Sequence, residues 1–288
     1  MASATQCQVC GGELLPYRHD WLSRCARCGV LSAALPVQIP GEASHAGIDE
    51  AARAAGLDSV RRSNNARLLA DLRRLAPEAR RLLDVGCGPD FLLDQAQAAG
   101  FEAHGVEPDA NVVELARSRG AEVSHGFFPD ALPAEARFDV IVFNDVLEHI
   151  PDLSGALAAA AGHLAPGGVL CLNCPDKRGL FFRVASALDR VGLSGAYDRL
   201  WQRGLPSPHV WYFTPTHLQT AARREGLSPA GESRLATLEL RGLWSRIRAV
   251  QDEPIALSAA SYLFSLGVYP LLRLLPSDAT ACYFRKAA

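Results

Sequence analysis

The sequence predicts an α/β protein with a doubly wound, mostly parallel sheet and a small N-terminal zinc ribbon. Three observations predict it. Apolar runs alternate with helical patterns between residues 79 and 174, the first run ends in a glycine turn, and two C-x2-C pairs precede residue 30. Alternating strands and helices are typical of parallel sheets covered by helices on both faces. At 288 residues and 49% hydrophobic content, the chain is long enough for such a core and a smaller module.

The N-terminal module is expected over residues 1–35, where two C-x2-C-G knuckles are separated by 14 residues. Four thiolates in this spacing predict a tetrahedral, structural zinc site with no open position. Two disulfides are the alternative, which a reducing compartment disfavours. Since the segment is poor in positive charge, we expect it to pack or to face substrate rather than nucleic acid. The predicted zinc ligands are Cys7, Cys10, Cys25 and Cys28.

Residues 36–78 are expected to form a linker followed by a helix. Pro36 and Pro40 favour an irregular start, and an apolar stripe at Leu68, Leu69 and Leu72 favours a helix that ends near residue 75.

The core is expected over residues 79–174. Its predicted strands are 81–85, 102–106, 122–125, 138–143 and 168–173, and its predicted helices lie near 91–99, 110–119 and 152–165. Cys171 and Cys174 repeat the C-x2-C spacing, but residues three apart on a strand point to opposite faces, so we expect both in the core.

A ligand crevice is predicted where these strands end. Glycine at 86 and 88 lets the backbone turn sharply and approach a nucleotide closely. Glu107 follows Asp84 by 23 residues, close to the roughly 20-residue interval of a ribose-binding acid, which leaves NAD and an adenosyl cofactor both open. Phe127 or Phe128 is expected either to stack on adenine or to pack in the core. The predicted cofactor residues are Asp84, Gly86, Gly88, Glu107, Phe127 and Asn144.

The remaining sequence divides into two predicted parts. Residues 175–212 form a weakly patterned insertion that is expected to cover the substrate, and residues 213–288 hold the last part of the sheet. Thr214 or Thr216 is expected to cap a helix that begins beside Pro215. Residues 255–272 carry no charge, and we expect a buried or interfacial helix pair there rather than a membrane span, with peripheral membrane contact as one role.

Four phrases resemble the class I S-adenosylmethionine-dependent methyltransferases, in matching order and spacing. They are L-L-D-V-G-C-G, G-V-E-P-D, F-D-V-I-V-F-N-D-V-L-E-H-I and L-A-P-G-G-V-L, within Asn65 to Asn173. The resemblance implies a Rossmann-like fold with a seven-stranded sheet and S-adenosylmethionine as cofactor. The family usually has a third glycine where this chain has Asp90, and we expect Asp90 to cap the following helix.

The phrase Asp145-Val-Leu-Glu148-His149 is similar to one in the ubiquinone-biosynthesis O-methyltransferases. That resemblance implies a divalent-metal site, magnesium or manganese, at Asp145, Glu148 and His149, with a histidine near the acceptor. The alternative is that Glu148 and His149 only brace the loop. We expect His149 as the general base, and His209, which borders the insertion, is the second candidate.

Composition limits the partners. A net charge of −2 offers no overall attraction for nucleic acid, and no apolar run of signal-peptide length opens the chain, so we expect a cytoplasmic enzyme. The predicted function is O-methylation of a hydroxyl on a small molecule or on a glycan or lipid precursor. The alternatives are an RNA methyltransferase that uses the ribbon to contact nucleic acid, and a catalytically silent cofactor-binding scaffold.

Overall fold

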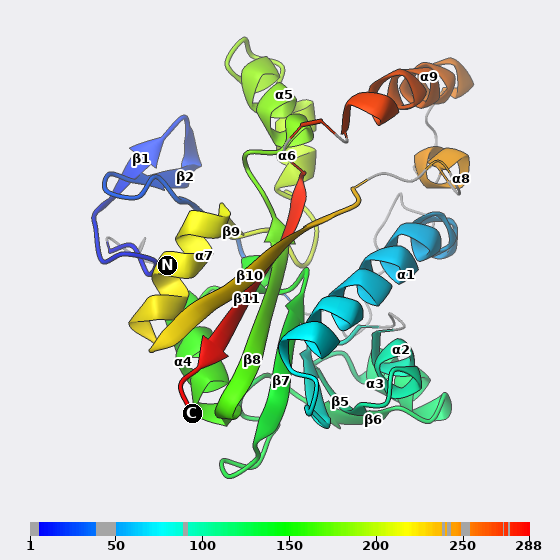
Figure 1. Cartoon of the computed structure of the whole chain (residues 1–288). Coiled ribbons are helices and arrows are strands. Elements are labelled where there is room, and N and C mark those ends of the chain that lie inside the picture. Colours follow the sequence, from blue (N-terminus) through cyan, green and yellow to red (C-terminus); the bar gives the residue numbers. More distant parts are fainter. Residues whose placement is uncertain are drawn as a thin grey trace.

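The computed structural model describes residues 6–38, 50–88, 92–237, 240, 243–248, 254–272, 274–275 and 277–288. Eleven strands and nine α-helices are assigned among them, arranged as in Figure 1. The strands are β1 Leu14–Tyr17, β2 His19–Cys25, β3 Leu31–Ala33, β4 Arg81–Val85, β5 Glu102–Glu107, β6 Glu122–His125, β7 Phe138–Asn144, β8 Leu164–Pro175, β9 Trp211–Tyr212, β10 Leu227–Leu235 and β11 Ala279–Lys286. The helices are α1 Glu50–Leu75, α2 Leu92–Ala98, α3 Ala110–Ser118, α4 Leu153–His163, α5 Leu180–Asp189, α6 Gly195–Leu200, α7 Pro215–Arg224, α8 Leu243–Arg248 and α9 Ile255–Leu272, with a 3-10 turn, η1, at Leu147–His149.

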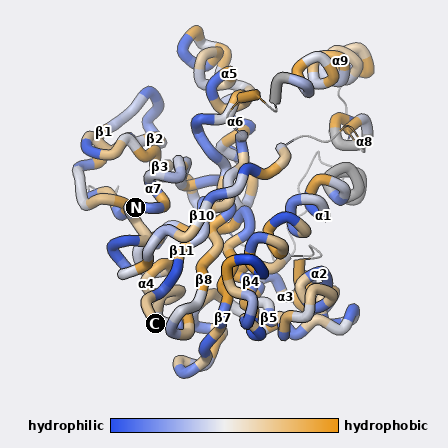
Figure 2. The backbone as a smooth tube through the Cα atoms, in the orientation of Figure 1, coloured by the Kyte–Doolittle hydropathy of each residue, from blue (hydrophilic) through white to orange (hydrophobic). Residues whose placement is uncertain are grey.

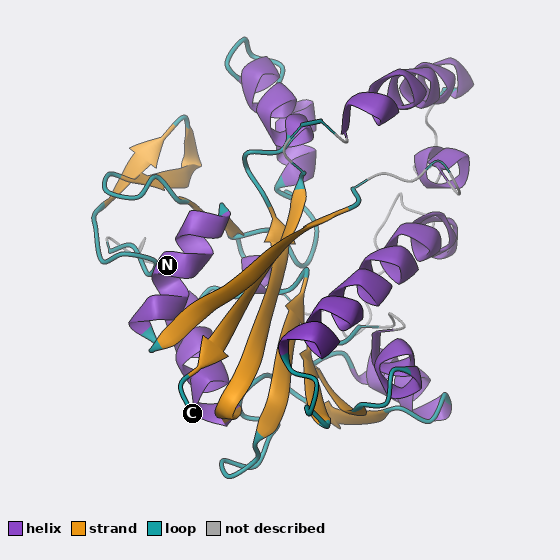
Figure 3. Cartoon of the chain, viewed as in Figure 1, coloured by secondary structure: helices purple, strands orange, loops and turns teal. Residues whose placement is uncertain are grey.

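A seven-stranded sheet forms the centre of the molecule, in the order β10-β11-β8-β7-β4-β5-β6 (Figure 3). β4, β5, β6, β7 and β8 are mutually parallel, and β11 runs antiparallel to both β8 and β10. The chain leaves β4 toward β5 and β6 and then returns to β7 on the other side of β4. This reversal creates a crevice at the carboxyl ends of β4 and β7, where ligands bind in such sheets. The predicted α/β fold is confirmed.

Strand periodicity explains why both faces of this sheet are covered. Successive residues of a strand point to opposite faces. Leu82 packs with α1, α2 and α3, whereas Leu83 packs with α4 and α7, and all of these layers are apolar. Cys171 belongs to the first cluster and Cys174 to the second, as their spacing on a strand predicts.

The predicted strand positions agree closely with the observed ones. The bounds of β4 and β6 are as expected, β5 and β7 each extend one residue further, and β8 begins four residues earlier and ends two later. Pro215 starts α7 with Thr214 as its N-cap, which selects one of the two predicted caps. Part of the predicted linker, residues 39–49, lies outside the described residues.

The N-terminal residues form a second sheet, in the order β1-β2-β3-β9. Its fourth strand comes from far along the chain, since β3 pairs antiparallel with Trp211 and Tyr212. We call residues 6–33 the ribbon, and residues 175–212 the insertion. The insertion, weakly patterned in the sequence, contains α5 and α6.

The apolar segment 255–272 differs from the expected buried or interfacial helix pair in being a single helix. It forms one continuous helix, α9, because Pro270 falls in its last turn, where proline ends a helix rather than dividing it. α9 packs on α8, and α8 packs on α1, so much of α9 remains exposed, with Ile255 at 68% and Leu263 at 67%. Orange segments of the α9 tube mark its apolar residues in Figure 2. Among the described residues, none of the helices combines the length and the hydropathy needed to cross a bilayer.

A buried carboxylate joins α1 to the sheet. Asp71, 6% exposed, accepts hydrogen bonds from Ser233 of β10 and from Tyr283 of β11, and pairs with Arg67 at 3.1 Å. Burial alone would raise the pKa of Asp71, but the hydrogen bonds from Ser233, Arg67, Arg74 and Tyr283 outweigh it and lower the pKa below its usual value.

We therefore expect Asp71→Asn to lower the free energy of unfolding by about 1–3 kcal/mol at pH 7, since two hydroxyl donors lose a charged acceptor. Asp58→Asn, on the exposed i,i+4 pair with Arg62, should cost less than about 0.5 kcal/mol. A depressed pKa stabilises above the unfolded-state value, so the difference between wild type and Asp71→Asn should shrink as the pH falls below about 4. Denaturant unfolding at pH 7 and pH 3 measures both; equal losses at the two pH values would contradict the assignment.

Candidate active site

A sharp backbone turn follows β4 at the crevice. Gly86 and Gly88 have φ angles of 67° and 55°, the left-handed region in which other residues are strained. A Cβ on Gly86 would lie 2.9 Å from both methyl groups of Val146, closer than Cβ atoms are found. The turn therefore requires glycine both for its conformation and for its fit against the loop after β7. Asp90, the predicted helix cap, lies outside the described residues, and α2 begins at Leu92.

Glu107 ends β5 beside this turn. Its carboxylate accepts the backbone N–H of Gly88 and of Asp109, each at 3.0 Å. Burial raises the pKa of Glu107 above its usual value, and the two N–H groups oppose this only in part. The carboxylate is thus held at the mouth of the turn, at the strand end where an acidic residue binds ribose hydroxyls in such folds.

Asn144, at the end of β7, is part of a chain of amides. It donates to Asn65 Oδ1 of α1 at 3.2 Å and accepts from Asn173 of β8 at 2.8 Å. Asp84, in the neighbouring strand β4, is buried, with only 2% of its surface exposed. Asn65 and Asn173 were not predicted as site residues. A polar residue at the end of a predicted apolar strand indicates a crevice position, and this pattern could have identified Asn173.

The two phenylalanines after β6 have different environments. Phe127 is 60% exposed, whereas Phe128 packs edge-to-face on Phe143 with ring centroids 5.7 Å apart. The turn is fixed by Gly126, whose N–H donates to the Glu107 carbonyl at 3.0 Å. Of the two, Phe127 is therefore the ring that can meet a ligand in the crevice, and Phe128 belongs to the core.

The loop after β7 carries a buried acid. Glu148, in η1, is 1% exposed, and in the described part of the chain no nitrogen or oxygen donor reaches its carboxylate oxygens; the nearby Cys174 thiol, a weak donor, lowers its pKa only slightly against the effect of burial. Burial raises the pKa of Glu148 well above its usual value, and the charge of Asp145 raises it further. A buried carboxyl group without donors needs either a proton or a cation to offset the loss of water.

Two imidazoles lie against Glu148. His209 Nε2 is 4.0 Å from Glu148 Oε1, and the rings of His149 and His209 are 4.7 Å apart, nearly perpendicular. His149 Nδ1 lies 3.0 Å from the Pro208 carbonyl oxygen. A carbonyl only accepts, so Nδ1 carries the proton and Nε2 of His149 is left as a lone-pair donor. We call Glu148, His149 and His209 the acid–histidine cluster.

Burial keeps both imidazoles neutral. It lowers the pKa of His149, and it lowers the pKa of His209 to about 3, with the neighbouring His149 adding to the effect. Ligand atoms of the three cluster residues lie within 4.8 Å of one another. Asp145, predicted as the third ligand, is not in this group; its Oδ1 accepts from Asn173 at 3.1 Å. The structure thus places His209, rather than Asp145, beside Glu148 and His149.

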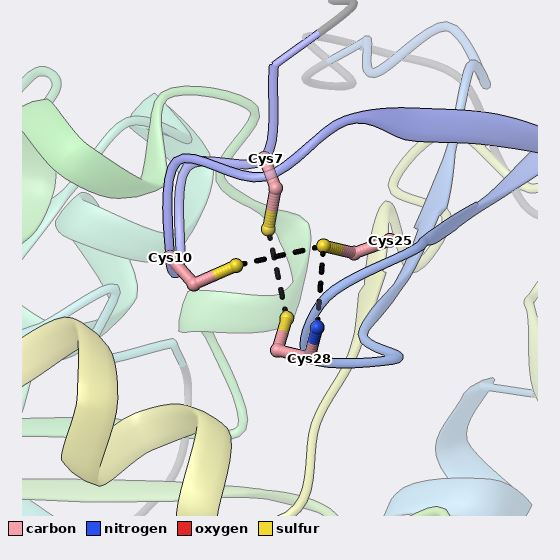
Figure 4. Close-up of side chains that lie close together, drawn as sticks. All are labelled: Cys7, Cys10, Cys25 and Cys28. Carbon is pink, nitrogen blue, oxygen red and sulfur yellow. Dashed lines mark hydrogen bonds between the residues drawn. The ribbon is translucent and has the colours of Figure 1, made fainter.

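The four ribbon cysteines converge, as Figure 4 shows. Sulfur atoms lie 3.5 Å apart for Cys10 and Cys25 and 3.8 Å apart for Cys7 and Cys28, and all four lie within 4.8 Å. A tetrahedron with bonds of about 2.3 Å has edges of about 3.8 Å, so the set fits zinc. Burial raises the pKa of Cys25, but the backbone N–H groups of Cys28 and Arg27 outweigh it and lower the pKa to about 6.

The sheet order, the glycine turn at the reversal and the acidic end of the next strand define the Rossmann-like methyltransferase fold. The chain belongs to the methyltransferase domain family, whose model matches residues 58–230.

Relatives agree with this assignment. The ubiquinone biosynthesis O-methyltransferases of Bordetella avium and of Bordetella pertussis are 29% and 30% identical to the chain over 54% and 53% of its length. The match spans 64% of each relative. The cyclopropane synthase MmaA2 from Mycobacterium tuberculosis has the same fold, with a TM-score of 0.50 and 17% identity over 76% of this chain and 84% of the other. The [4+2]-cyclase SpnF, at 0.50 and 19% over 77% and 81%, does too. The fold alone therefore does not specify the reaction.

We expect Gly86→Ala to weaken S-adenosylmethionine binding at least tenfold, about 1.4 kcal/mol, because a Cβ strains the turn and meets Val146. Isothermal titration calorimetry measures the change. Gly162→Ala, where a Cβ meets no atom within 4 Å, is the matched control and should bind as wild type. Equal affinities of the two variants would show that the turn does not hold the cofactor.

Proposed function

We propose that the protein transfers a methyl group from S-adenosylmethionine to a hydroxyl of a small molecule, a glycan precursor or a lipid precursor. The acid–histidine cluster is the observation that carries the proposal. It combines a neutral imidazole with a free lone pair and a buried acid on the loop after β7, the loop whose Val146 packs against the glycine turn. The names of the curated relatives support a hydroxyl acceptor.

In this proposal the chain binds the cofactor along one line of strand ends. Gly86 and Gly88 let the backbone approach the cofactor closely. Glu107 accepts hydrogen bonds from the ribose hydroxyls, and Phe127 stacks on the adenine ring. Asp84 and Asn144 complete the cofactor side of the crevice. When bound, S-adenosylmethionine supplies a methyl group on a positively charged sulfur. Holding donor and acceptor in line is the main contribution of such a site and can supply roughly 7–11 kcal/mol.

The acceptor hydroxyl must lose its proton as its oxygen bonds to the methyl carbon and the carbon–sulfur bond breaks. His149 Nε2 takes this proton in our proposal, since its other nitrogen is fixed on the Pro208 carbonyl. His209 lies next to it and is the second candidate base.

As the alternative to a free His149 base, we propose a divalent cation at the acid–histidine cluster: His149 Nε2 would then be a ligand, and the cation would lower the pKa of the acceptor hydroxyl. The unsatisfied Glu148 oxygens support it. Asp145, Glu148 and His149, the set read from the sequence, would suit magnesium or manganese. With His209 replacing Asp145, two imidazoles and one carboxylate favour manganese or another transition metal over magnesium.

Methyl-labelled S-adenosylmethionine and a host extract, separated into RNA, protein, lipid and small-molecule fractions, test the function. Label in the lipid or small-molecule fraction supports it, and restoration by manganese after mild chelation, with the ribbon metal still bound, supports the cation. Label in RNA would instead establish the RNA methyltransferase. Tight cofactor binding without label in any fraction would indicate a silent scaffold.

We expect His149→Ala to lower kcat about 10²- to 10⁴-fold, the usual contribution of a general base, while the Kd for S-adenosylmethionine stays within twofold. His104→Ala, on β5 and hydrogen-bonded to Ser124, is the control and should keep normal kcat. A His149→Ala enzyme with normal kcat would remove His149 from the mechanism.

We propose that the ribbon cysteines bind one structural zinc. Cys28→Ser should lose the zinc and lower the thermal midpoint, since metal binding contributes directly to folding of such modules. Cys174→Ala removes a thiol from the other C-x2-C pair and should keep one zinc per chain by elemental analysis. Loss of zinc from Cys174→Ala alone would mean that the wrong pair was assigned.

Finally, we propose that the acceptor is presented at a membrane surface. α5 follows β8 and α8 follows β10, so both lie toward the strand ends that form the crevice, and α9 adjoins α8 (Figure 1). Exposed arginines flank the apolar residues of α5, which suits anionic head groups. Apolar side chains more than a third exposed on these elements and on the turn after α5 are Val184, Leu188, Val191, Leu193, Trp244, Ile255, Leu257, Leu263 and Phe264.

Wild type should therefore sediment with anionic phospholipid vesicles, and a Leu263→Glu, Phe264→Glu double variant should bind them at least tenfold more weakly, since each buried side chain contributes about 1.5–3 kcal/mol. Leu115→Glu changes a similarly exposed leucine on α3 and should bind normally. If the double variant changes only the oligomeric state, α9 is an interface between copies of the chain.

A further inference from the structure

We infer that the ribbon positions the acid–histidine cluster, with Gln8 and His217 as its positioning residues. The inference rests on the proposed function for its catalytic consequence, but its structural content concerns the two loops that carry the cluster. These loops are residues 147–154, which hold Glu148 and His149, and residues 207–213, which hold His209. The ribbon forms hydrogen bonds to both loops.

The first knuckle contacts the loop that follows His149. Gln8, between Cys7 and Cys10, donates from Nε2 to the Pro151 carbonyl at 3.0 Å and accepts the N–H of Ser154 at its Oε1, also at 3.0 Å. One side chain therefore holds both the end of the η1 loop and the first turn of α4. Gln8 can bridge these groups because the knuckle fixes its backbone on either side.

A backbone relay connects the two loops to the ribbon. Val210, which follows His209, donates its N–H to the Glu148 carbonyl at 2.8 Å, and its own carbonyl accepts from Ala33 of β3 at 2.8 Å. Trp211 Nε1 adds a hydrogen bond to the Ile150 carbonyl at 2.9 Å. The segment with His209 is thus held between the ribbon on one side and the Glu148 loop on the other.

The second knuckle is held at its carbonyls. His217 Nε2 lies 2.9 Å from the Cys28 carbonyl oxygen, and His217 Nδ1 accepts the N–H of Thr214 at 3.0 Å. His217 is therefore oriented so that its Nε2–H donates to the Cys28 carbonyl oxygen. Lys177, just after β8, donates to the Gly29 carbonyl. The His217 imidazole therefore links Cys28, one of the proposed zinc ligands, to the segment after β9.

Aromatic packing completes the contact between the ribbon and the insertion. Trp21 of β2 meets Trp201 edge-to-face at 5.5 Å, and Trp201 meets Tyr212 at 4.9 Å. The Trp201 carbonyl accepts the N–H of His209 at 3.0 Å. In the described part of the chain, the hydrogen bonds of Gly88 and Glu107 go to the core and not to the ribbon. Loosening the ribbon should therefore disturb the cluster and leave the cofactor turn intact.

Hydrogen exchange read by mass spectrometry on the full zinc-loaded chain tests this inference. Gln8→Ala should increase exchange of residues 147–154 and 207–213 at least tenfold and leave residues 82–88 and 103–107 unchanged. Gln6→Ala is the matched control, because Gln6 is exposed beside the same knuckle and, among the described residues, its side chain hydrogen-bonds only to the Gly11 carbonyl. Unchanged exchange in Gln8→Ala, or an equal increase at the cofactor turn, would overturn the inference.

A second pair of variants separates positioning from folding. His217→Gln keeps an N–H donor for the Cys28 carbonyl, whereas His217→Ala removes it, so the glutamine variant should recover most of the protection lost in the alanine variant. Zinc content and S-adenosylmethionine affinity should match wild type in both, while kcat should fall at least tenfold in the alanine variant. Because exchange needs no acceptor, an absence of methyl transfer would count against the proposed function and not against this inference.

Discussion

Parallel pairing of β4 with both β5 and β7 is the constraint on which the site depends. Because β4 is the first strand of the core and its neighbours are added on opposite sides, the crevice opens at the carboxyl ends of β4 and β7. The glycine turn directly follows β4, Glu107 is the last residue of β5 and Asn144 is the last residue of β7. Their proximity follows from strand register, so short segments with little sequence in common meet at one edge of the sheet.

Glu148 shows how packing sets chemistry. Burying an ionised carboxyl group without hydrogen-bond donors costs free energy. The same burial disfavours protonation of the two neighbouring imidazoles, which therefore stay neutral. The three groups are therefore either all neutral, or they together bind a cation from solution. In the first state His149 Nε2 is an unprotonated nitrogen, free to accept a proton at neutral pH, which an exposed histidine provides only in part.

Much of the fold could be predicted from the sequence, since apolar runs and turn glycines are local signals. Strands 81–85 and 122–125 were placed at their observed bounds, and the two knuckles converge as their spacing predicts. The strand-end residues and His209 could be predicted, but not how the helix and loop residues come together. Asn65 comes from a helix whose orientation no local pattern gives, and the approach of His209 to Glu148 depends on the hydrogen bond from Val210 to the Glu148 carbonyl. Whether the uncharged segment 255–272 is buried or interfacial could not be decided from its sequence, because both environments favour an uncharged helix; its exposure excludes the buried alternative.

Completion of the ribbon sheet by β9 has a consequence for the order of biosynthesis. The first 33 residues leave the ribosome long before Trp211 and Tyr212, so β3 must wait with an open edge while about 180 residues are added. The ribbon sheet can therefore be completed only after β4 to β8 of the core have been synthesised. Any exchange of this module between proteins would have to carry the β9 segment with it, although the two are distant in the coding sequence.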